Sequence, residues 1–271
     1  MPVYRGTQKV TPMVGTSRPK RVYRGSNLVW QDLPVVLITG TTFAESRDQF
    51  RNACVAYGTT YDTVEVLPFR LDTSNATDLG FLFSGCSKLK AAPELDWSKT
   101  HLLTQAFYNC TSLISAPNIH APLATTISQI FQGCTSLTSS PSIYAPAATS
   151  ASQAFSGCSS LVSVGDLDIG SVTNASSMFS GCQNLVTAPS INSTQLTNIR
   201  SMFSRCGSIT FVPDIQTSLV TNASYAFNEC SALTDGNVRC IGKQSGVATT
   251  NMIASSGLTR LPFYNSAGNP I

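Results

Sequence analysis

The sequence predicts a repeat solenoid, because three kinds of residue recur at one spacing along most of the chain. Seven cysteines are separated by 24 residues at each of six successive intervals. A phenylalanine stands three residues before each of these cysteines, and an aliphatic residue stands three residues after it. A period of this length is typical of solenoids, in which a repeat buries its apolar side only against its neighbours. The predicted core consists of Phe83, Cys86, Phe107, Cys110, Phe131, Cys134, Phe155, Cys158, Phe179, Cys182, Phe203, Cys206, Phe227 and Cys230.

Each repeat also contains a bend and a second aliphatic position, so that it reads F-x-x-C-x-x-L-x-x-x-P-x-I. The segment from Leu113 towards Ile119 is the expected strand, and successive repeats would align such strands into a narrow parallel sheet. A threonine or asparagine precedes the apolar pair at the phenylalanine, which favours a short helical turn there. We expect about eight turns over residues 71–271, the last of them degenerate, with Met252 and Ser255 at the phenylalanine and cysteine positions.

Residues 36–70 are expected to cap the solenoid with a strand, a helix and a second strand. An apolar run at residues 35–38 predicts the first strand. Thr42 and Glu45 form a capping box ahead of Phe50, Ala53 and Cys54, which share one helical face. Apolar and polar residues alternate over residues 63–67, which predicts the second strand.

Residues 1–35 form a basic arm that contains a short duplication. The phrase Val-Tyr-Arg-Gly occurs at residues 3–6 and again at residues 22–25. Each copy predicts two strands around a glycine turn, with too few apolar residues to fold alone. The arm carries six Lys or Arg residues against Asp32, a net charge of +5, and the remainder of the chain is therefore −2. We expect the arm to dock on another protein through Tyr4, Arg5, Tyr23, Arg24 and Trp30.

The composition excludes several classes of function. A basic arm is compatible with nucleic acid or an anionic membrane, but six charges without stacked aromatic residues or a known module argue against nucleic acid. The chain has no apolar signal core and no run of about 18 apolar residues, so neither export nor a membrane span is predicted. Only 11% of residues are charged. The surface should therefore suit hydrogen bonding to neutral partners.

The nine cysteines do not suggest disulfides or a metal site. A cysteine at one phase of every turn should point inwards and behave as a buried, reduced core residue. Neighbouring ladder cysteines could approach bonding distance, but parallel side chains do not by themselves give a disulfide torsion. No C-x-x-C pair or His-Cys cluster is present, so we predict no zinc site and no cofactor.

A strip of variable polar residues is the candidate ligand-binding surface. The residues eight and ten places after each cysteine flank the buried aliphatic residue of the expected strand, so their side chains should point outwards. An unconstrained solvated face would show the same variation, and that interpretation stays open. The strip consists of Glu94, Asp96, Asn118, His120, Ser142, Tyr144, Asp166, Asp168, Ser190, Asn192, Asp214 and Gln216.

No catalytic constellation is evident, so the protein is not expected to be an enzyme. His101 and His120 are the only histidines, and neither stands in a nucleophile pattern. The pairs Glu94/Asp96 and Asp166/Asp168 could bind a hard cation or act on a glycan, but such pairs are common on exposed strands.

The repeat resembles the BspA-type leucine-rich repeats, in particular turns that read S-x-M-F-x-G-C-x-x-L-x-x-A-P. Residues 177–189 match that phrase, and residues 71–78 are similar to the D-T-S-N-V-T-x-M wording of the same group. The resemblance covers residues 68–265. It implies a right-handed leucine-rich-repeat coil and says much less about function.

Members of that family are surface and adhesion proteins of bacteria and protists, and related repeats occur in phage structural proteins. The duplicated Val-Tyr-Arg-Gly arm resembles the N-terminal segments of minor tail proteins from phages of actinobacteria. A virion protein assembled in the host cytoplasm needs no signal peptide. The resemblance therefore implies a phage tail protein whose arm contacts other tail proteins and whose solenoid adheres noncovalently to host cell-surface glycan or protein.

Two other functions remain open at this point. The solenoid could be a purely structural tail or capsid accessory without a receptor. A bacterial surface adhesin is the second alternative, but export and anchoring signals are missing from the sequence. A homo-oligomer is possible, although no coiled-coil heptads support one.

Overall fold

The computed structural model describes residues 33–243, 245–265 and 267–271 in full, together with the backbone of four short strands closer to the N-terminus. These strands are β1 (Val3–Arg5), β2 (Gln8–Val10), β3 (Tyr23–Arg24) and β4 (Asn27–Leu28). β1 pairs antiparallel with β2, and β3 pairs antiparallel with β4. Each copy of the duplicated phrase therefore forms two paired strands, as its sequence predicts.

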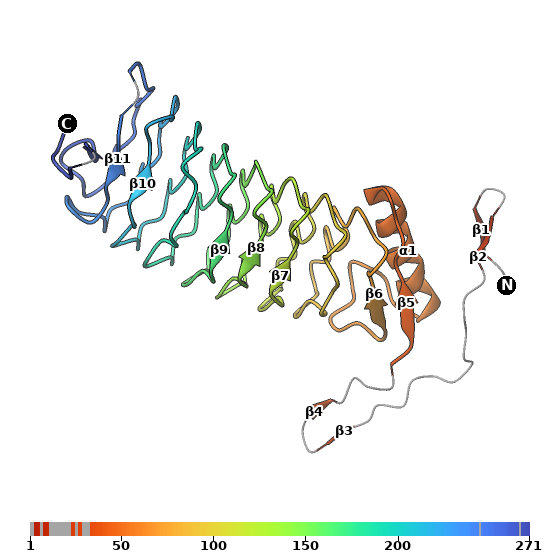
Figure 1. Cartoon of the computed structure of the whole chain (residues 1–271). Helices are drawn as coiled ribbons and strands as arrows, with labels where there is room; N and C mark the ends of the chain where they lie inside the picture. The colour runs from red at the N-terminus through yellow and green to blue at the C-terminus, as the bar shows by residue number, and fades with distance from the viewer. Residues whose placement is uncertain are drawn as a thin grey trace.

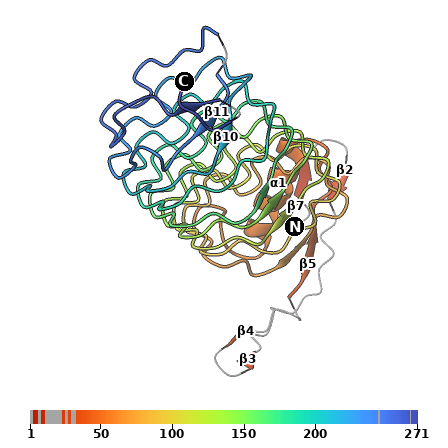
Figure 2. The same cartoon turned by 60° about the vertical axis from the view of Figure 1, so that its left-hand side comes forward.

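From residue 70 to the C-terminus the chain winds through a stack of similar coils (Figure 1). Figure 2 views the stack closer to its long axis and shows successive coils following similar paths. Strands one repeat apart pair in parallel and form two three-stranded sheets. The first contains β7 (Ile119–His120), β8 (Ile143–Tyr144) and β9 (Leu167–Asp168), and the second contains β10 (Ile215–Gln216), β11 (Cys240–Ile241) and β12 (Phe263–Tyr264). The predicted repeat fold with parallel strands is confirmed, and the hand of the coil stays a prediction.

The strands of these sheets are shorter than the sequence predicts, because they begin nine residues after the cysteine in β7 to β10 rather than three. Pro117 stands between Leu113 and Ile119, and proline has no N–H to donate to a neighbouring strand. Parallel bridges also join the coils at two other columns. One runs from Asp78 to Ala248, and the other includes the pairs Ala91–Ser115, Ser139–Ser163 and Thr187–Phe211.

The segment before each phenylalanine forms consecutive β-turns, so the prediction of a helical turn is wrong. The N–H of Ile130 donates to the carbonyl of Ile127, and the N–H of Cys134 donates to that of Phe131. The third residues of these turns, Gln129 and Gly133, have φ angles of 58° and 75°. Type II turns require a positive φ at that position. Alternate N–H groups donate to carbonyls of the next coil, for example Phe131 to Ala154 over 2.8 Å. In a helix these N–H groups would donate to carbonyls of the same segment.

The core is a ladder of phenylalanine rings beside a ladder of thiols. Consecutive rings from Phe83 to Phe227 stack with centroids 5.0–5.9 Å apart and planes within 12°. Each thiol from Cys110 to Cys230 donates to the carbonyl of a phenylalanine on the preceding coil, for example Cys158 to Phe131 over 3.1 Å. All nine cysteines are buried free thiols, and burial raises the pKa of Cys158 to about 12. The predicted burial of the ladder is confirmed.

The first coil is closed by helix α1 (Phe43–Ala56), which lies at that end of the stack (Figure 1). The Thr42 hydroxyl accepts the N–H of Glu45 over 3.3 Å, so the predicted helix start is confirmed. Buried Phe50 contacts Phe83 edge to face, with centroids 4.9 Å apart, and this contact closes the aromatic ladder.

The strand predicted at residues 63–67 is absent, although Val64 and Leu67 in this segment are buried. The second strand of the cap is β6 (Arg70–Asp72), which pairs in parallel with β5 (Val35–Leu37). Leu71 stands two repeat lengths before Ile119, so β6 already has the phase of the later strands.

The last turn is two residues out of phase, where the sequence predicts one. Asn222 bridges with Ala248, which stands 26 residues later. Ile253 and Ser256 therefore take the phenylalanine and cysteine positions, rather than Met252 and Ser255. The end of the chain folds back on β12, since Tyr264 bridges antiparallel to Pro270 and the N–H of Ile271 donates to Phe263.

Candidate binding surface

The twelve residues of the predicted strip line one side of the stack, and none of them is buried. Glu94, Asp96, Asn118, His120, Tyr144, Asp166, Ser190, Asn192 and Asp214 are exposed, whereas Ser142, Asp168 and Gln216 are half-buried. The short strands fix this orientation because neighbouring side chains of a strand point to opposite faces. In β7, Ile119 is buried and His120 is exposed, and in β8 the same holds for Ile143 and Tyr144. The sequence thus located the strip correctly, and its role in binding stays a prediction.

The middle of the strip contains an ordered pair of rings with polar side chains beside it. The rings of His120 and Tyr144 are stacked, with centroids 4.6 Å apart and planes at 7°. The Asn118 side-chain oxygen accepts the N–H of Ser142 over 3.0 Å, and the Ser142 hydroxyl accepts the N–H of Asp166 over 3.2 Å. Each of these side chains is therefore held by a neighbouring coil, so that the middle of the strip is preorganised.

The strip is acidic. Five of its twelve residues are carboxylates and none is Lys or Arg. Every carboxylate of the chain between residues 79 and 213 belongs to it: Glu94, Asp96, Asp166 and Asp168. The amide of Asn192 donates to Asp168 over 3.2 Å, and Asp214 makes a bidentate pair with Arg239, at 2.8 and 2.6 Å. Arg239 balances the charge of Asp214, so the negative potential along this side comes from the other four carboxylates, and Lys99 lies near one of them, Asp96.

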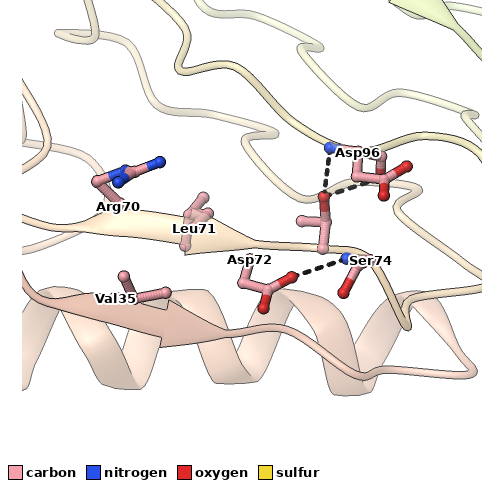
Figure 3. Close-up of a pocket in the computed structure, with 7 residues that line it drawn as sticks. Val35, Arg70, Leu71, Asp72, Ser74 and Asp96 are labelled. Carbon is pink, nitrogen blue, oxygen red and sulfur yellow. Dashed lines mark hydrogen bonds between the residues drawn. The ribbon is translucent and has the colours of Figure 1, made fainter.

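A hollow of about 340 Å³ continues the strip at its N-terminal end. It is lined by Val35, Arg70, Leu71, Asp72, Thr73, Ser74 and Asp96 (Figure 3). Asp72 stands one repeat before Asp96, so it is the next member of the same column. The column predicted from the cysteines starts at Cys86 and misses Asp72, although the 24-residue spacing could have located it.

Hydrogen bonds fix the two carboxylates of the hollow. The Ser74 N–H donates to Asp72 over 3.0 Å, and the hydroxyl and N–H of Ser74 lower the pKa of the Asp72 carboxyl (Figure 3). Ser98 lowers the pKa of Asp96 in the same way. The Thr73 hydroxyl donates to the Asp96 carbonyl and accepts its N–H, both over 2.8 Å. Both carboxyls are therefore ionised at neutral pH and contribute negative charge to the strip.

The other predicted functional residues lie apart from the strip. His101 is exposed and stands nine residues before a ladder cysteine, outside the columns of the strip. Its carbonyl accepts a hydrogen bond from the hydroxyl of Thr125. The side chains of the predicted docking residues Tyr4, Arg5, Tyr23 and Arg24, and the whole of Trp30, lie outside the described residues.

Within the described ranges, no group of three His, Cys, Asp or Glu side chains is placed to hold a metal ion. The same part of the chain contains no helix with the length and apolar character needed to cross a bilayer.

Two family models match the repeats. One is described as "BspA type Leucine rich repeat region (6 copies)" and matches residues 74–186. The other is described as "Mycoplasma protein of unknown function, DUF285" and matches residues 149–256. A comparison with curated proteins found no match. Among solved structures, a leucine-rich repeat protein from Bacteroides ovatus ATCC 8483 is 17% identical, with a TM-score of 0.25, over 66% of this chain and 68% of that chain. Together with the 24-residue period and the parallel pairing, the six-copy match shows that residues 74–186 are similar to BspA-type leucine-rich repeats.

Proposed function

We propose that the protein is a phage virion minor tail protein and that its strip binds the host cell surface noncovalently. The observation that carries the proposal is the contrast between a constant core and a variable strip. Phenylalanine and cysteine recur without exception from Phe83 to Cys230, whereas the residue ten places after the cysteine is Asp, His, Tyr, Asp, Asn and Gln in successive coils. A surface without a ligand needs no such order, and here the variable residues are held by hydrogen bonds and ring stacking.

The chemistry of the strip favours a hydroxyl-rich, uncharged or cationic ligand. Carboxylates, amides and a serine hydroxyl accept hydrogen bonds from sugar hydroxyls, and the rings of His120 and Tyr144 supply apolar area between them. Five carboxylates in the strip disfavour an anionic ligand, because charges of like sign across an interface are repulsive. Envelope glycan with neutral sugars is the ligand class that fits best.

The proposal that the protein belongs to a phage tail is based on the sequence of the arm. The duplicated phrase at residues 3–6 and 22–25 resembles the N-terminal segments of actinobacteriophage tail proteins, and the arm is the part of the chain we expect other tail proteins to bind. In this proposal the stacked coils project the strip away from that attachment point. The proposal involves no catalytic step and no cofactor.

The test is binding of the N-terminally labelled full chain to a panel of actinobacterial cells. A strip variant combines Asn118→Ala, His120→Ala, Ser142→Ala and Tyr144→Ala. A matched control changes four exposed residues in the column four places after the cysteine: Ile114→Ser, Thr138→Ala, Val162→Ser and Thr210→Ala. We expect saturable binding that the strip variant loses and the control retains. Equal binding by both variants would show that the strip is not the binding surface, and no binding to any strain would favour a structural accessory protein.

A further inference from the structure

One side of the stack has exposed apolar residues and no charged residues over five successive coils. This surface, the apolar side, stands one to seven places after the ladder cysteines and comprises residues 111–117, 135–141, 159–165, 183–189 and 207–213. Its exposed large apolar side chains, each 44–52% accessible, are those of Ile114, Val162, Val186 and Phe211. An extended apolar patch at a protein surface is typical of an interaction site.

Backbone contacts between coils align these exposed residues in rows. The N–H of Ile114 donates to the carbonyl of Lys90 over 2.9 Å, one repeat earlier. Parallel bridges, such as Thr187–Phe211, align the next column in the same way. Equivalent side chains therefore repeat about every 4.8 Å along the stack, and a partner would meet a regular surface.

Cations lie at the N-terminal end of the apolar side. Lys88 and Lys90 stand on the coil before it, and both are exposed. Lys90 pairs with Glu65 over 2.7 Å, whereas Lys88, which lies near the same carboxylate, makes no ion pair among the described residues. Lys88 is therefore available to a carboxylate of a partner.

An acid lies at the opposite end of the apolar side. Asp235 stands on the coil after it and is exposed. Its carboxylate accepts the hydroxyl and the N–H of Thr259, and these bonds lower its pKa, so that it is ionised at neutral pH. Arg260 lies near it but donates to the Tyr264 hydroxyl over 3.1 Å, and no ion pair joins Asp235 to a described residue. Asp235 is therefore available to a cation of a partner.

The apolar side has matching features before and after its middle coil, which carries Val162. Ile114 and Phe211 stand two coils before and two coils after that coil, and Lys88 and Asp235 stand three coils before and three coils after it. A two-fold axis through Val162, perpendicular to the stack, would place apolar residues opposite apolar residues and Lys88 opposite Asp235 of a second copy. Interfaces between identical copies have this symmetry, in which residue i contacts j and j contacts i.

We propose that two copies of the chain pack antiparallel through their apolar sides, about a two-fold axis at Val162. Charge complementarity between the two ends favours a second copy as the partner and determines its direction. A parallel pair would bring Lys88 against its own equivalent, and like charges across an interface are repulsive. The contact leaves the strip of each copy open, because the strip stands beyond the proline bend on the neighbouring side of each coil.

The size of the contact determines how readily the dimer dissociates. The apolar side and its charged ends extend over six coil steps, roughly 30 Å, and about five residues of each coil give a width of roughly 16 Å. Each copy therefore contributes roughly 500 Å², less than the roughly 800 Å² per partner that is typical of stable complexes. The dimer should be reversible, with a dissociation constant in the micromolar range.

Disulfide cross-linking of the full chain tests the position of the axis and the direction of the copies. All nine native cysteines are buried, so a cysteine introduced at the surface is the thiol that an added oxidant reaches. Val162→Cys should form a disulfide-linked dimer, because at the axis this position faces its own equivalent. Ile114→Cys should form one only in combination with Phe211→Cys. Leu123→Cys, at a position that is 45% exposed on another side, measures background. Cross-linking of Ile114→Cys alone, or equal yields at Val162 and Leu123, would overturn the proposal.

Sedimentation equilibrium over about 1 to 200 μM gives a second readout without cross-linking. We expect the mass to rise with concentration from that of one chain towards that of two. Val162→Arg should weaken the dimer at least about tenfold, because it places two cations together at the axis, whereas Leu123→Arg should not. A single mass at all concentrations, or equal effects of the two arginine variants, would contradict the proposal.

Exchange of the two end charges tests the direction again. Lys88→Glu should weaken the dimer, and its combination with Asp235→Lys should restore it, because each copy then presents both charges reversed. A double variant weaker than the single one, with an unchanged circular dichroism spectrum, would argue against the antiparallel contact. None of these assays contains a host ligand. The control variant of the adhesion test alters the apolar side, so it should be monomeric with an intact strip.

Discussion

The imidazole of His120 lies face to face with the phenol ring of Tyr144, with centroids 4.6 Å apart and planes at 7°. The same geometry joins Phe131 and Phe155 in the core, at 5.6 Å and 12°. In both pairs the 24-residue period places like positions of adjacent coils one above the other. They differ in burial, since Tyr144 is 39% exposed and Phe155 is fully buried. One period thus produces both a core contact and an ordered surface pair.

This difference predicts unequal costs of substitution. Phe155→Ala should lower the free energy of unfolding by about 3–5 kcal/mol, because it leaves a cavity in a closely packed ladder. Tyr144→Ser should cost about 1 kcal/mol, since it removes a ring stack but little buried area. Urea unfolding followed by circular dichroism measures both. Equal costs would refute the placement of the two columns.

The turns favour glycine at two equivalent positions, so replacing it at one and introducing it at the other should have opposite effects on stability. Gly157 and Arg205 both stand one residue before a ladder cysteine, with φ angles of 76° and 62°. An added methyl group at Gly157 meets nothing closer than 3.8 Å, so Gly157→Ala should be destabilising by about 1 kcal/mol through backbone strain alone. Arg205→Gly should be stabilising by a similar amount, because the Arg205–Glu229 pair it removes is exposed and contributes little. Thermal unfolding measures the two shifts, and the same sign for both would contradict the turn assignment.

The buried thiols predict a loss of stability at alkaline pH. Burial raises the pKa of Cys158, Cys230 and Cys240 to about 12, whereas an unfolded thiol titrates near 8.5. Above about pH 8.5 the unfolded chain releases protons that the folded chain keeps, so the free energy of unfolding falls as pH rises towards the folded pKa. Each thiol contributes a slope of about 1.4 kcal/mol per pH unit.

Urea unfolding with a reductant at several pH values between about 8 and 11 measures that slope. Cys158→Ala should reduce this slope by about 1.4 kcal/mol per pH unit, the contribution of one thiol, whatever its effect on stability at neutral pH. A free energy of unfolding that stays constant over this range would show that the thiols are not shielded from solvent.

The sequence located the core and the strip because both follow from phase. One cysteine per 24 residues is enough to assign Phe155 inwards and Tyr144 outwards. Helix α1 was also predictable, since Thr42 and Glu45 mark its start and Phe50 its buried face. These features depend on residue type and spacing alone.

The remaining features depend on contacts between coils, which spacing does not reveal. The polar residues before each phenylalanine fit a helical turn as well as they fit type II turns. The turns are favoured because alternate N–H groups bond to the next coil. In the last coil the pairing of Asn222 with Ala248 sets the phase, while Met252 resembles the missing phenylalanine. The hollow at Asp72 forms only because β5 and β6 pair at the cap.

The most direct test of the central claim is the dissociation constant of the full chain for cell-wall polysaccharide purified from a strain that it binds. We expect Tyr144→Ala or His120→Ala alone to weaken binding at least about tenfold, as removal of a central aromatic contact does in other interfaces. Ile114→Ser, on an exposed column away from the strip, should leave the dissociation constant unchanged. Equal affinity of wild type and both strip variants would contradict the assignment of the strip as the binding surface.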